Sequence, residues 1–342
     1  MTPDGTVLAV GGLGLRMPGV TAPADLIRQL TGEVPVPGAG RSLTAANTDL
    51  PPVDRWVPAS VEPRLPPGLP ARGLRNWPHE SLLALAAAAE AAEAGAEAAE
   101  AEAEAEAVQQ APDATAVLWA SSTAGLPEYA GVCLDAALLD PGLTSPILAP
   151  LAAYNGPAST VSIRLGLTGP VETLVGGVTA GMAAVIEAGH LLAAGEASCA
   201  LVGGSAVTSR WSLAGVSDGL APAEGSACLA LAPGVAGAVT LRRSRRVGFD
   251  PVHGLDGVRE LVHAAGPVAG VVLASPDPAV ADALTELAGS VWHIERELGD
   301  FGAAGGFLAV VCAATLCAAG QPAVLALAVE PAGTASCMEV WS

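Results

Sequence analysis

The sequence PVETLVGGVTAGMAAVIEAGHLLAAGEASCALVGGSA occupies residues 170–206 and has the clearest pattern in this chain. It predicts a strand, a tight glycine turn, a long helix of small residues and a second strand that ends in paired glycines. Such a turn commonly presents a reactive side chain at the N-terminus of the helix, where the helix dipole stabilises negative charge. This chain has Gly176, Gly177 and Val178 there. The layout of a nucleophile site is present, but a hydrocarbon side chain occupies it.

The composition indicates a large globular protein. The chain has 342 residues, 51% of them hydrophobic, and a mean hydropathy of +0.48. This length can bury a large core and suits one large or two fused α/β domains. The formal net charge is −19, from 34 acidic and 15 basic residues. Nucleic acids and anionic membranes require a basic surface, so neither is an expected partner, and any acidic partner would also be repelled.

The sequence contains no pattern of a metal or cofactor site. Its six cysteines are scattered through apolar segments, without a CxxC pair or a His/Cys cluster at zinc-ligand spacing. We expect them to be buried as small hydrophobic residues in a reducing cytoplasm. The N-terminus lacks the pattern of a secretory signal, and the most apolar segment, residues 307–319, is too short to span a membrane. A cytoplasmic protein is therefore expected.

Strand and helix patterns alternate along the chain. Apolar strands interleaved with small-residue helices predict a mixed sheet covered on both faces. Prolines interrupt residues 32–72, which predicts loops, and residues 80–95 predict a strong helix. The helix runs into an Ala/Glu-rich insertion at about 94–107. Its alternating glutamates leave no apolar stripe, so a solvated helix extension or a frayed insertion is favoured over a functional acidic tract.

One arrangement occurs twice in the chain. A glycine turn precedes a buried Ala-rich helix at residues 176–194 and again at 302–319. The repetition predicts two related halves. We assign the first to residues 1–235 and the second, which is shorter, to residues 236–342.

Six segments show the same order as the motifs of a known family. They are VLAVGGLGLRMPG (7–19), LAPLAAYNGPASTVSIRLGLTGP (148–170), LLAAGEASCALVGGSA (191–206), SDGLAPAEGSACLAL (217–231), FGAAGG (301–306) and PAGTASCMEV (331–340). Together they resemble the β-ketoacyl synthases of the thiolase superfamily over nearly the whole chain. The resemblance implies an α/β protein with a thiolase-like layered α-β-α-β-α fold built from two related halves.

The resemblance also locates the catalytic positions of an active ketosynthase. These enzymes carry a cysteine at the nucleophile turn, whose thiolate accepts the acyl chain, together with two histidines and a lysine. Here the cysteine position is Val178 and the lysine position is Ile294. Ser275 and Gly299 stand at the two histidine positions. Four such substitutions imply that the chain has no condensing activity.

Other residues do not replace these groups. Thr179 is a hydroxyl beside Val178, but the sequence places no base near it. Four histidines lie far from the catalytic turns in the sequence, and the fifth is one residue from the lysine position. We expect each to be a surface or structural histidine: His79, His190, His253, His263 and His293.

A ketosynthase-like chain without the cysteine resembles the chain length factors of type II polyketide synthases. These proteins form a heterodimer with an active ketosynthase and shape the tunnel that holds the growing polyketide. The resemblance implies that this chain meets an acyl carrier protein only through that complex. We expect Leu174, Val178 and Met182 at the interface or on the tunnel wall. Chain length factors commonly have Gln at position 178, so valine points to a divergent branch of them.

The resemblance further implies a gate that limits product length. In chain length factors it lies on the helix after the VLWASS-type strand, with three side chains at positions i, i+3 and i+7. These positions fall on Leu126, Tyr129 and Cys133, which the spacing puts on one helical face. The same spacing also suits ordinary core packing. Both interpretations stay open at this point.

Two other functions are compatible with the sequence. One is an enzyme of altered chemistry, such as a decarboxylase or an acyltransferase, and the other is a homodimeric, non-catalytic scaffold. Decarboxylation suits the sequence less well, because it also needs the histidine pair that Ser275 and Gly299 replace.

Overall fold

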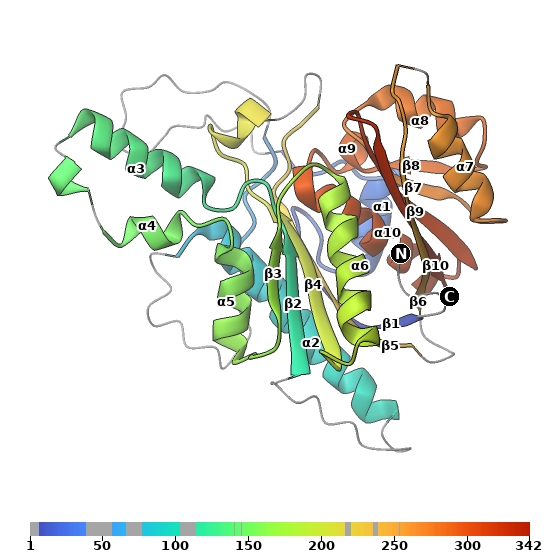
Figure 1. The fold of residues 1–342 in the computed structure, drawn as a ribbon, viewed down its shortest axis with the longest axis horizontal. Helices are drawn as coiled ribbons and strands as arrows, with labels where there is room; N and C mark the ends of the chain where they lie inside the picture. The colour runs from blue at the N-terminus through green and yellow to red at the C-terminus, as the bar shows by residue number, and fades with distance from the viewer. Residues whose placement is uncertain are drawn as a thin grey trace.

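The computed structural model describes residues 7–38, 57–65, 77–102, 114–139, 141–144, 146–215, 220–234, 239–252 and 254–342. Ten strands of these residues form one continuous sheet, in the order β3-β2-β4-β5-β1-β6-β10-β9-β7-β8 (Figure 1). The strands are β1 Leu8–Arg16, β2 Thr115–Ala120, β3 Val171–Leu174, β4 Cys199–Ala206, β5 Gly225–Pro233, β6 Thr240–Gly248, β7 Val271–Ala274, β8 Val291–His293, β9 Ala323–Glu330 and β10 Thr334–Trp341.

Helices connect and cover these strands. They are α1 Pro23–Leu30, α2 His79–Glu102, α3 Leu126–Leu138, α4 Leu148–Leu151, α5 Gly156–Leu165, α6 Thr179–Ala193, α7 Asp256–Ala264, α8 Pro278–Thr285, α9 Ile294–Glu297 and α10 Gly305–Ala318. Short 3₁₀ turns lie at Pro141–Leu143, Ser212–Gly215 and Gly302–Ala304. None of the helices described is long and apolar enough to cross a membrane.

The sheet consists of two halves with the same strand order. In the first half the order is β3-β2-β4-β5-β1, and in the second the corresponding order is β8-β7-β9-β10-β6. In both halves the first three strands of this order are parallel to one another. The fourth strand is antiparallel to the third, and the fifth is antiparallel to the fourth. The expected α/β fold of two related halves is thus confirmed. The boundary at residues 235 and 236 stays a prediction, because residues 235–238 lie outside the described chain.

Alternating side chains along the strands divide the core into layers. On β9, Val324 packs with α10, whereas Leu325 packs with α7 and α8. On β2, Leu118 packs with α6, whereas Trp119 packs with α2 and α5. Five layers follow from this packing. Helices α2 and α5 cover the outer face of the first half-sheet, helices α7 and α8 cover the outer face of the second, and helices α6 and α10 lie between the two half-sheets. This is a layered α-β-α-β-α architecture, with the two repeated helices α6 and α10 at its centre.

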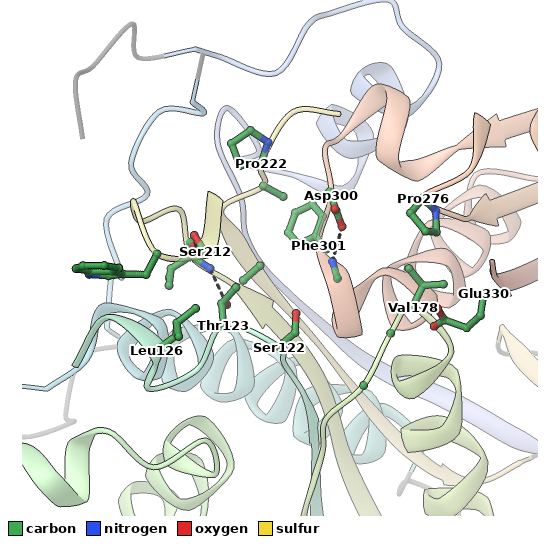
Figure 2. Close-up of a pocket in the computed structure, with 17 residues that line it drawn as sticks. Ser122, Thr123, Leu126, Val178, Ser212, Pro222, Pro276, Asp300, Phe301 and Glu330 are labelled. Atoms are coloured by element: carbon green, nitrogen blue, oxygen red, sulfur yellow. Dashed lines mark hydrogen bonds between the residues drawn. The ribbon is translucent and has the colours of Figure 1, made fainter. Parts of the chain in front are cut away.

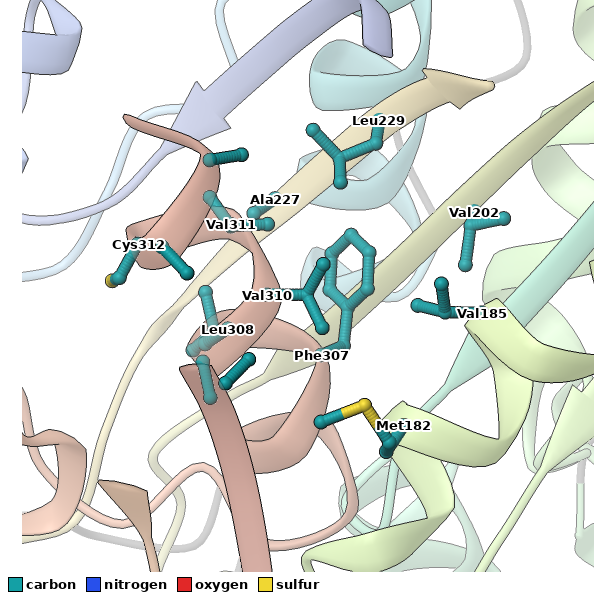
Figure 3. Close-up of a cluster of buried hydrophobic side chains, with 14 of the residues drawn as sticks. Met182, Val185, Val202, Ala227, Leu229, Phe307, Leu308, Val310, Val311 and Cys312 are labelled. Carbon is teal, nitrogen blue, oxygen red and sulfur yellow. The ribbon is translucent and has the colours of Figure 1, made fainter. Parts of the chain in front are cut away.

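The two central helices are in direct contact. Figure 3 shows Phe307 of α10 beside Met182 and Val185 of α6, and all three side chains are fully buried. Small residues elsewhere in both helices allow this close approach. The N-termini of α6 and α10 are thereby brought together, and they define one wall of the candidate site.

The structure modifies two predictions on composition. Helix α2 continues to Glu102, so the first part of the Ala/Glu-rich insertion is a helix extension, while residues 103–107 lie outside the described chain. Five cysteines are buried as expected, but Cys133 is exposed on α3. The expectation of burial was wrong for Cys133 because α3 stands away from the sheet (Figure 1).

Candidate functional site

The turn between β3 and α6 closes one end of a cavity of about 280 Å³ (Figure 2). Both halves of the fold contribute to its walls. Leu126 and Val178 line it from the first half, and Pro276, Phe301 and Glu330 line it from the second. The cavity therefore depends on the contact between the halves.

Val178 stands where the sequence places it, directly before the first residue of α6. Its side chain is 2% exposed to solvent in the chain and lies on the cavity wall. Its carbonyl oxygen accepts a hydrogen bond from the backbone amide of Gly306 at 3.0 Å. The residue contributes a hydrocarbon surface at the amide end of a helix, and it carries no atom that could accept an acyl group.

Glu330 occupies the amide end of the same helix. Its Oε1 accepts a hydrogen bond from the backbone amide of Thr179 at 2.9 Å and lies 3.5 Å from the hydroxyl of Thr179. A Cβ at Gly177 would lie 2.1 Å from this oxygen, so the glycine makes room for the carboxylate. Val178 forms no side-chain cap, and Glu330 caps the helix instead. The sequence reasoning missed this residue, whose signal is a glutamate at the end of an apolar strand.

Three segments that contain substituted catalytic positions meet at Gly305. A Cβ built there would lie 3.4 Å from Val178 Cγ1, 3.6 Å from Ala274 Cβ and 3.1 Å from Glu295 Oε1. Ala274 precedes the first histidine position, and Glu295 follows the lysine position. The backbone of Gly305 is therefore the point at which these three segments of the chain meet.

The residues that the resemblance places at the lysine position and the second histidine position, Ile294 and Gly299, carry no ionisable side chain. Ile294 is fully buried in the same core cluster as Val178. Gly299 adopts a φ of 101° in a turn, and the next residue, Asp300, lines the cavity. No lysine can enter this site from elsewhere in the chain, because all 15 basic residues are arginines.

The first histidine position lies in a buried polar cluster. The amide of Ser275 donates to Glu295 Oε2 at 2.8 Å, and His293 Nε2 donates to the carbonyl oxygen of Ser275 at 2.8 Å. Burial raises the pKa of Glu295. Burial lowers the pKa of His293, but its hydrogen bonds to Glu295 and to the Ser275 carbonyl outweigh that effect and raise it. These contacts hold the peptide of Ser275 in place, and none of the three residues lines the cavity.

The ionisable groups on the cavity wall are two carboxylates, Asp300 and Glu330. Oδ1 of Asp300 accepts a hydrogen bond from the amide of Gly302 at 2.8 Å. Among the described residues that line the cavity there is no histidine, cysteine or arginine. The wall therefore offers no cation to polarise a thioester carbonyl.

Another buried carboxyl group holds the turn on the opposite wall. Glu80, in the first turn of α2, accepts hydrogen bonds from Ser121 Oγ, from Ser205 Oγ at 2.7 Å and from Thr123 Oγ1 at 2.8 Å. Thr123 lines the cavity. Burial raises the pKa of Glu80, although these hydroxyl donors oppose the shift.

The three predicted gate residues differ in their surroundings. Leu126 lines the cavity at the start of α3. Tyr129 is 58% exposed and Cys133 is also exposed in this chain, and α3 contains no buried residue. The interpretation of this face as ordinary core packing is wrong for α3, because the helix projects away from the sheet (Figure 1). The gate itself stays a prediction.

Two residues expected at the interface or on the tunnel wall do not line this cavity, and whether they contact a partner stays a prediction. Met182 is fully buried between α6 and α10, and Leu174 is half-buried against the same core cluster. Neither lines the cavity at Val178. Both point toward the core of their own chain because α6 and β3 pack there.

The edge strand of the sheet next to the site carries exposed hydrophobic side chains beside one exposed glutamate, Glu172. β3 is the last strand of the sheet, and no described strand pairs with its other edge. Three large hydrophobic side chains are exposed here, and we call them the β3-edge surface: Val171 of β3, Val175 directly after it, and Ile163 of α5, which packs against β3. A cluster of this kind marks a protein interaction surface more often than a free one.

Comparison with known proteins identifies the family. The family model described as Beta-ketoacyl synthase, N-terminal domain, matches residues 7–240, which is more than half of the chain. The chain belongs to the β-ketoacyl synthase family. No curated protein sequence gives a significant match.

Solved structures show the same fold over the full length. A ketosynthase/chain length factor described as that of ishigamide is 18% identical, with a TM-score of 0.74 and coverage of 98% of this chain and 99% of that chain. The type II polyketide synthase complex AntDE:AntF is 12% identical, with a TM-score of 0.69 and the same coverage of 98% and 99%. A β-ketoacyl synthase from Burkholderia phymatum STM815 is 14% identical, with a TM-score of 0.74 and coverage of 98% and 99%. At these identities the likeness is one of fold, and the fold is the thiolase-like fold of ketosynthases.

Proposed function

We propose that the chain is a chain length factor: a ketosynthase-like subunit without condensing activity that pairs with an active ketosynthase and shapes the tunnel controlling polyketide chain length. One observation carries the proposal. Val178, which the resemblance assigns to the nucleophile position, lines a cavity whose described wall has no cysteine, histidine or lysine. A condensing enzyme needs a nucleophile and groups that handle protons and negative charge. A tunnel wall needs only inert surface.

The β3-edge surface supports the partner in this proposal. An unpaired strand edge flanked by exposed hydrophobic side chains is costly in water and is commonly covered by another chain. We assign it to an active ketosynthase, which supplies the cysteine and the histidines. AntDE:AntF is described as an acyl carrier protein in complex with its ketosynthase. By analogy, this chain meets the carrier protein and the growing polyketide within the complex.

The cavity also bears on the alternative of altered chemistry. The hydroxyl of Thr179 lies 3.5 Å from Glu330 Oε1, which is the nearest approach to a nucleophile and base on this wall. That oxygen already accepts the Thr179 amide at 2.9 Å, and an ordinary carboxylate is a weak base for a hydroxyl. The arrangement therefore favours a helix cap over an acyl acceptor.

Co-expression with an active type II ketosynthase tests the proposal. We expect a 1:1 complex that elongates malonyl units only when both chains are present. A stable homodimer that ignores the ketosynthase would favour the scaffold function. A mass increase equal to an acyl group on the isolated chain would favour the enzyme of altered chemistry.

A further inference from the structure

The cavity at Val178 combines an apolar wall with a fixed negative charge. Glu330 and Asp300 are the ionisable side chains on its described wall, and Figure 2 shows Glu330 reaching toward the first turn of α6 beside Val178. The N-terminus of a helix ordinarily attracts anions, because its free amides point outward. Here the amide of Thr179 is already bonded to the Glu330 carboxylate.

The position of Glu330 is built into the backbone. Gly177 leaves the space that its carboxylate fills, since a Cβ there would lie 2.1 Å from Oε1. The carbonyl oxygen of Glu330 accepts a hydrogen bond from the amide of Gly333 at 3.0 Å, and Gly333 has a φ of 94°. This tight turn between β9 and β10 fixes the backbone of Glu330, whose side chain then bonds the first amide of α6. The carboxylate belongs to the wall of the cavity and is not a free surface group.

We propose that Glu330, together with Asp300, makes this cavity selective by charge: it admits neutral, apolar acyl groups and rejects acyl groups that carry a carboxylate, such as malonyl. A ligand carboxylate in this cavity would add a third negative charge to those of Glu330 and Asp300 in a partly dehydrated site, with no described cation on the wall to compensate. The identity of the natural ligand as an acyl chain rests on the proposed function. The charge selectivity is a property of the cavity alone.

Alkylation of an introduced thiol tests this selectivity directly. In the full-length Val178→Cys variant, the thiol replaces a side chain on the cavity wall. Iodoacetamide and iodoacetate have nearly the same size and differ in charge. The rate with each reagent is followed by peptide mass spectrometry, and the exposed Cys133 in the same sample is the internal standard. The ratio of the two rates cancels any change in the fraction of thiolate.

We expect the rate ratio of iodoacetate to iodoacetamide at position 178, relative to Cys133, to rise roughly tenfold when Glu330→Gln is added. Glu330→Gln preserves the acceptor oxygen for Thr179. Glu286→Gln, which removes one charge from the exposed surface near the end of α8, is the matched control and leaves the ratio unchanged. Should Glu330→Gln fail to fold, Val178→Cys with Asp300→Asn tests the second charge, with the same direction expected.

An unchanged ratio in both Glu330→Gln and Asp300→Asn would overturn the proposal, and so would a thiol that reacts with neither reagent in any variant. The assay uses no ketosynthase and no synthase activity. Loss of the heterodimer in co-expression would therefore refute the proposed function without affecting the charge selectivity. An unchanged alkylation ratio would refute the charge selectivity without affecting the proposed function.

Discussion

The backbone amide of Gly306 donates a hydrogen bond of 3.0 Å to the carbonyl oxygen of Val178. The bond joins the start of α10 in the second half to the residue that precedes α6 in the first. A Cβ at Gly306 would lie 2.3 Å from the same carbonyl oxygen. The two repeated helices are thus held together at the wall of the cavity, at a position where only glycine fits.

Gly306→Ala is expected to destabilise the chain by about 1–3 kcal/mol, because the added methyl group forces α6 and α10 apart. Urea unfolding measures the change. Gly131→Ala is the matched control, since it also lies within a helix and has no atom within 4 Å of its Cβ position. It should be neutral or stabilising by up to about 1 kcal/mol. Equal effects of the two variants would contradict the close contact at Gly306.

The isolated chain is expected neither to be acylated by an acyl-carrier substrate nor to decarboxylate a malonyl one. Val178→Cys alone should not create condensing activity, because Ser275, Ile294 and Gly299 still provide no group for proton transfer or charge stabilisation. Intact-mass analysis and release of carbon dioxide measure both steps. Elongation by the Val178→Cys chain alone would show that the remaining groups suffice.

Val175→Asp is expected to abolish the complex with the ketosynthase while the chain stays folded, because it leaves an unpaired charge in the β3-edge surface. Val252→Asp introduces the same charge at another exposed valine and should have no effect. Leu174→Asp should also lose the complex, but by unfolding, since Leu174 packs against the core of its own chain. Co-purification and circular dichroism separate the two causes. A Val175→Asp chain that still co-purifies at unit stoichiometry would place the interface elsewhere.

Tyr129→Ala is expected to lengthen the polyketide product and Cys133→Phe to shorten it, with the complex intact in both cases. The reason is volume: Tyr129 is the bulkiest of the three side chains that we assign to the gate, and its exposure in the single chain leaves it free to meet a tunnel formed across the interface. Product profiles from the co-expressed pair measure the effect. Tyr154→Ala, which removes the other tyrosine from the exposed surface outside α3, should not change the length. Unchanged profiles in both variants, with normal yield of the complex, would move the gate to another helix.

Glu80→Gln is expected to change how stability depends on pH. Burial raises the pKa of folded Glu80 above 4.5, its ordinary value. Well below pH 4.5 the carboxyl group is protonated in both the folded and the unfolded chain, so its ionisation does not affect the free energy of unfolding. As the pH rises through 4.5, the unfolded chain ionises first, so the wild type loses stability until the raised pKa is passed. The wild type should therefore lose stability relative to Glu80→Gln as the pH rises from acidic values toward neutral. Parallel stability curves of the two proteins would contradict a raised pKa.

The sequence alone indicated the family and placed Val178 at the turn before the first central helix. Hydrophobic periods and glycine turns predicted the strands and helices around Val178, and the order of six motifs identified the ketosynthase-like fold, because these features are local or depend only on order along the chain. The absence of a catalytic cysteine and of any lysine is likewise a matter of residue identity. Such statements need no coordinates.

Only the tertiary structure showed which distant residues surround Val178 and which predicted residues lie away from the cavity. Glu330 and Thr179 are 151 residues apart, and their contact exists because β9 and α6 belong to different halves that meet at the cavity. The positions of two predicted residues also depend on tertiary packing. Met182 lies in the core and not on the cavity wall, and Tyr129 is exposed because α3 stands away from the sheet (Figure 1). Periodicity shows which residues share one face of a helix or strand. Which surface covers that face depends on long-range packing between elements, and local sequence patterns do not encode it.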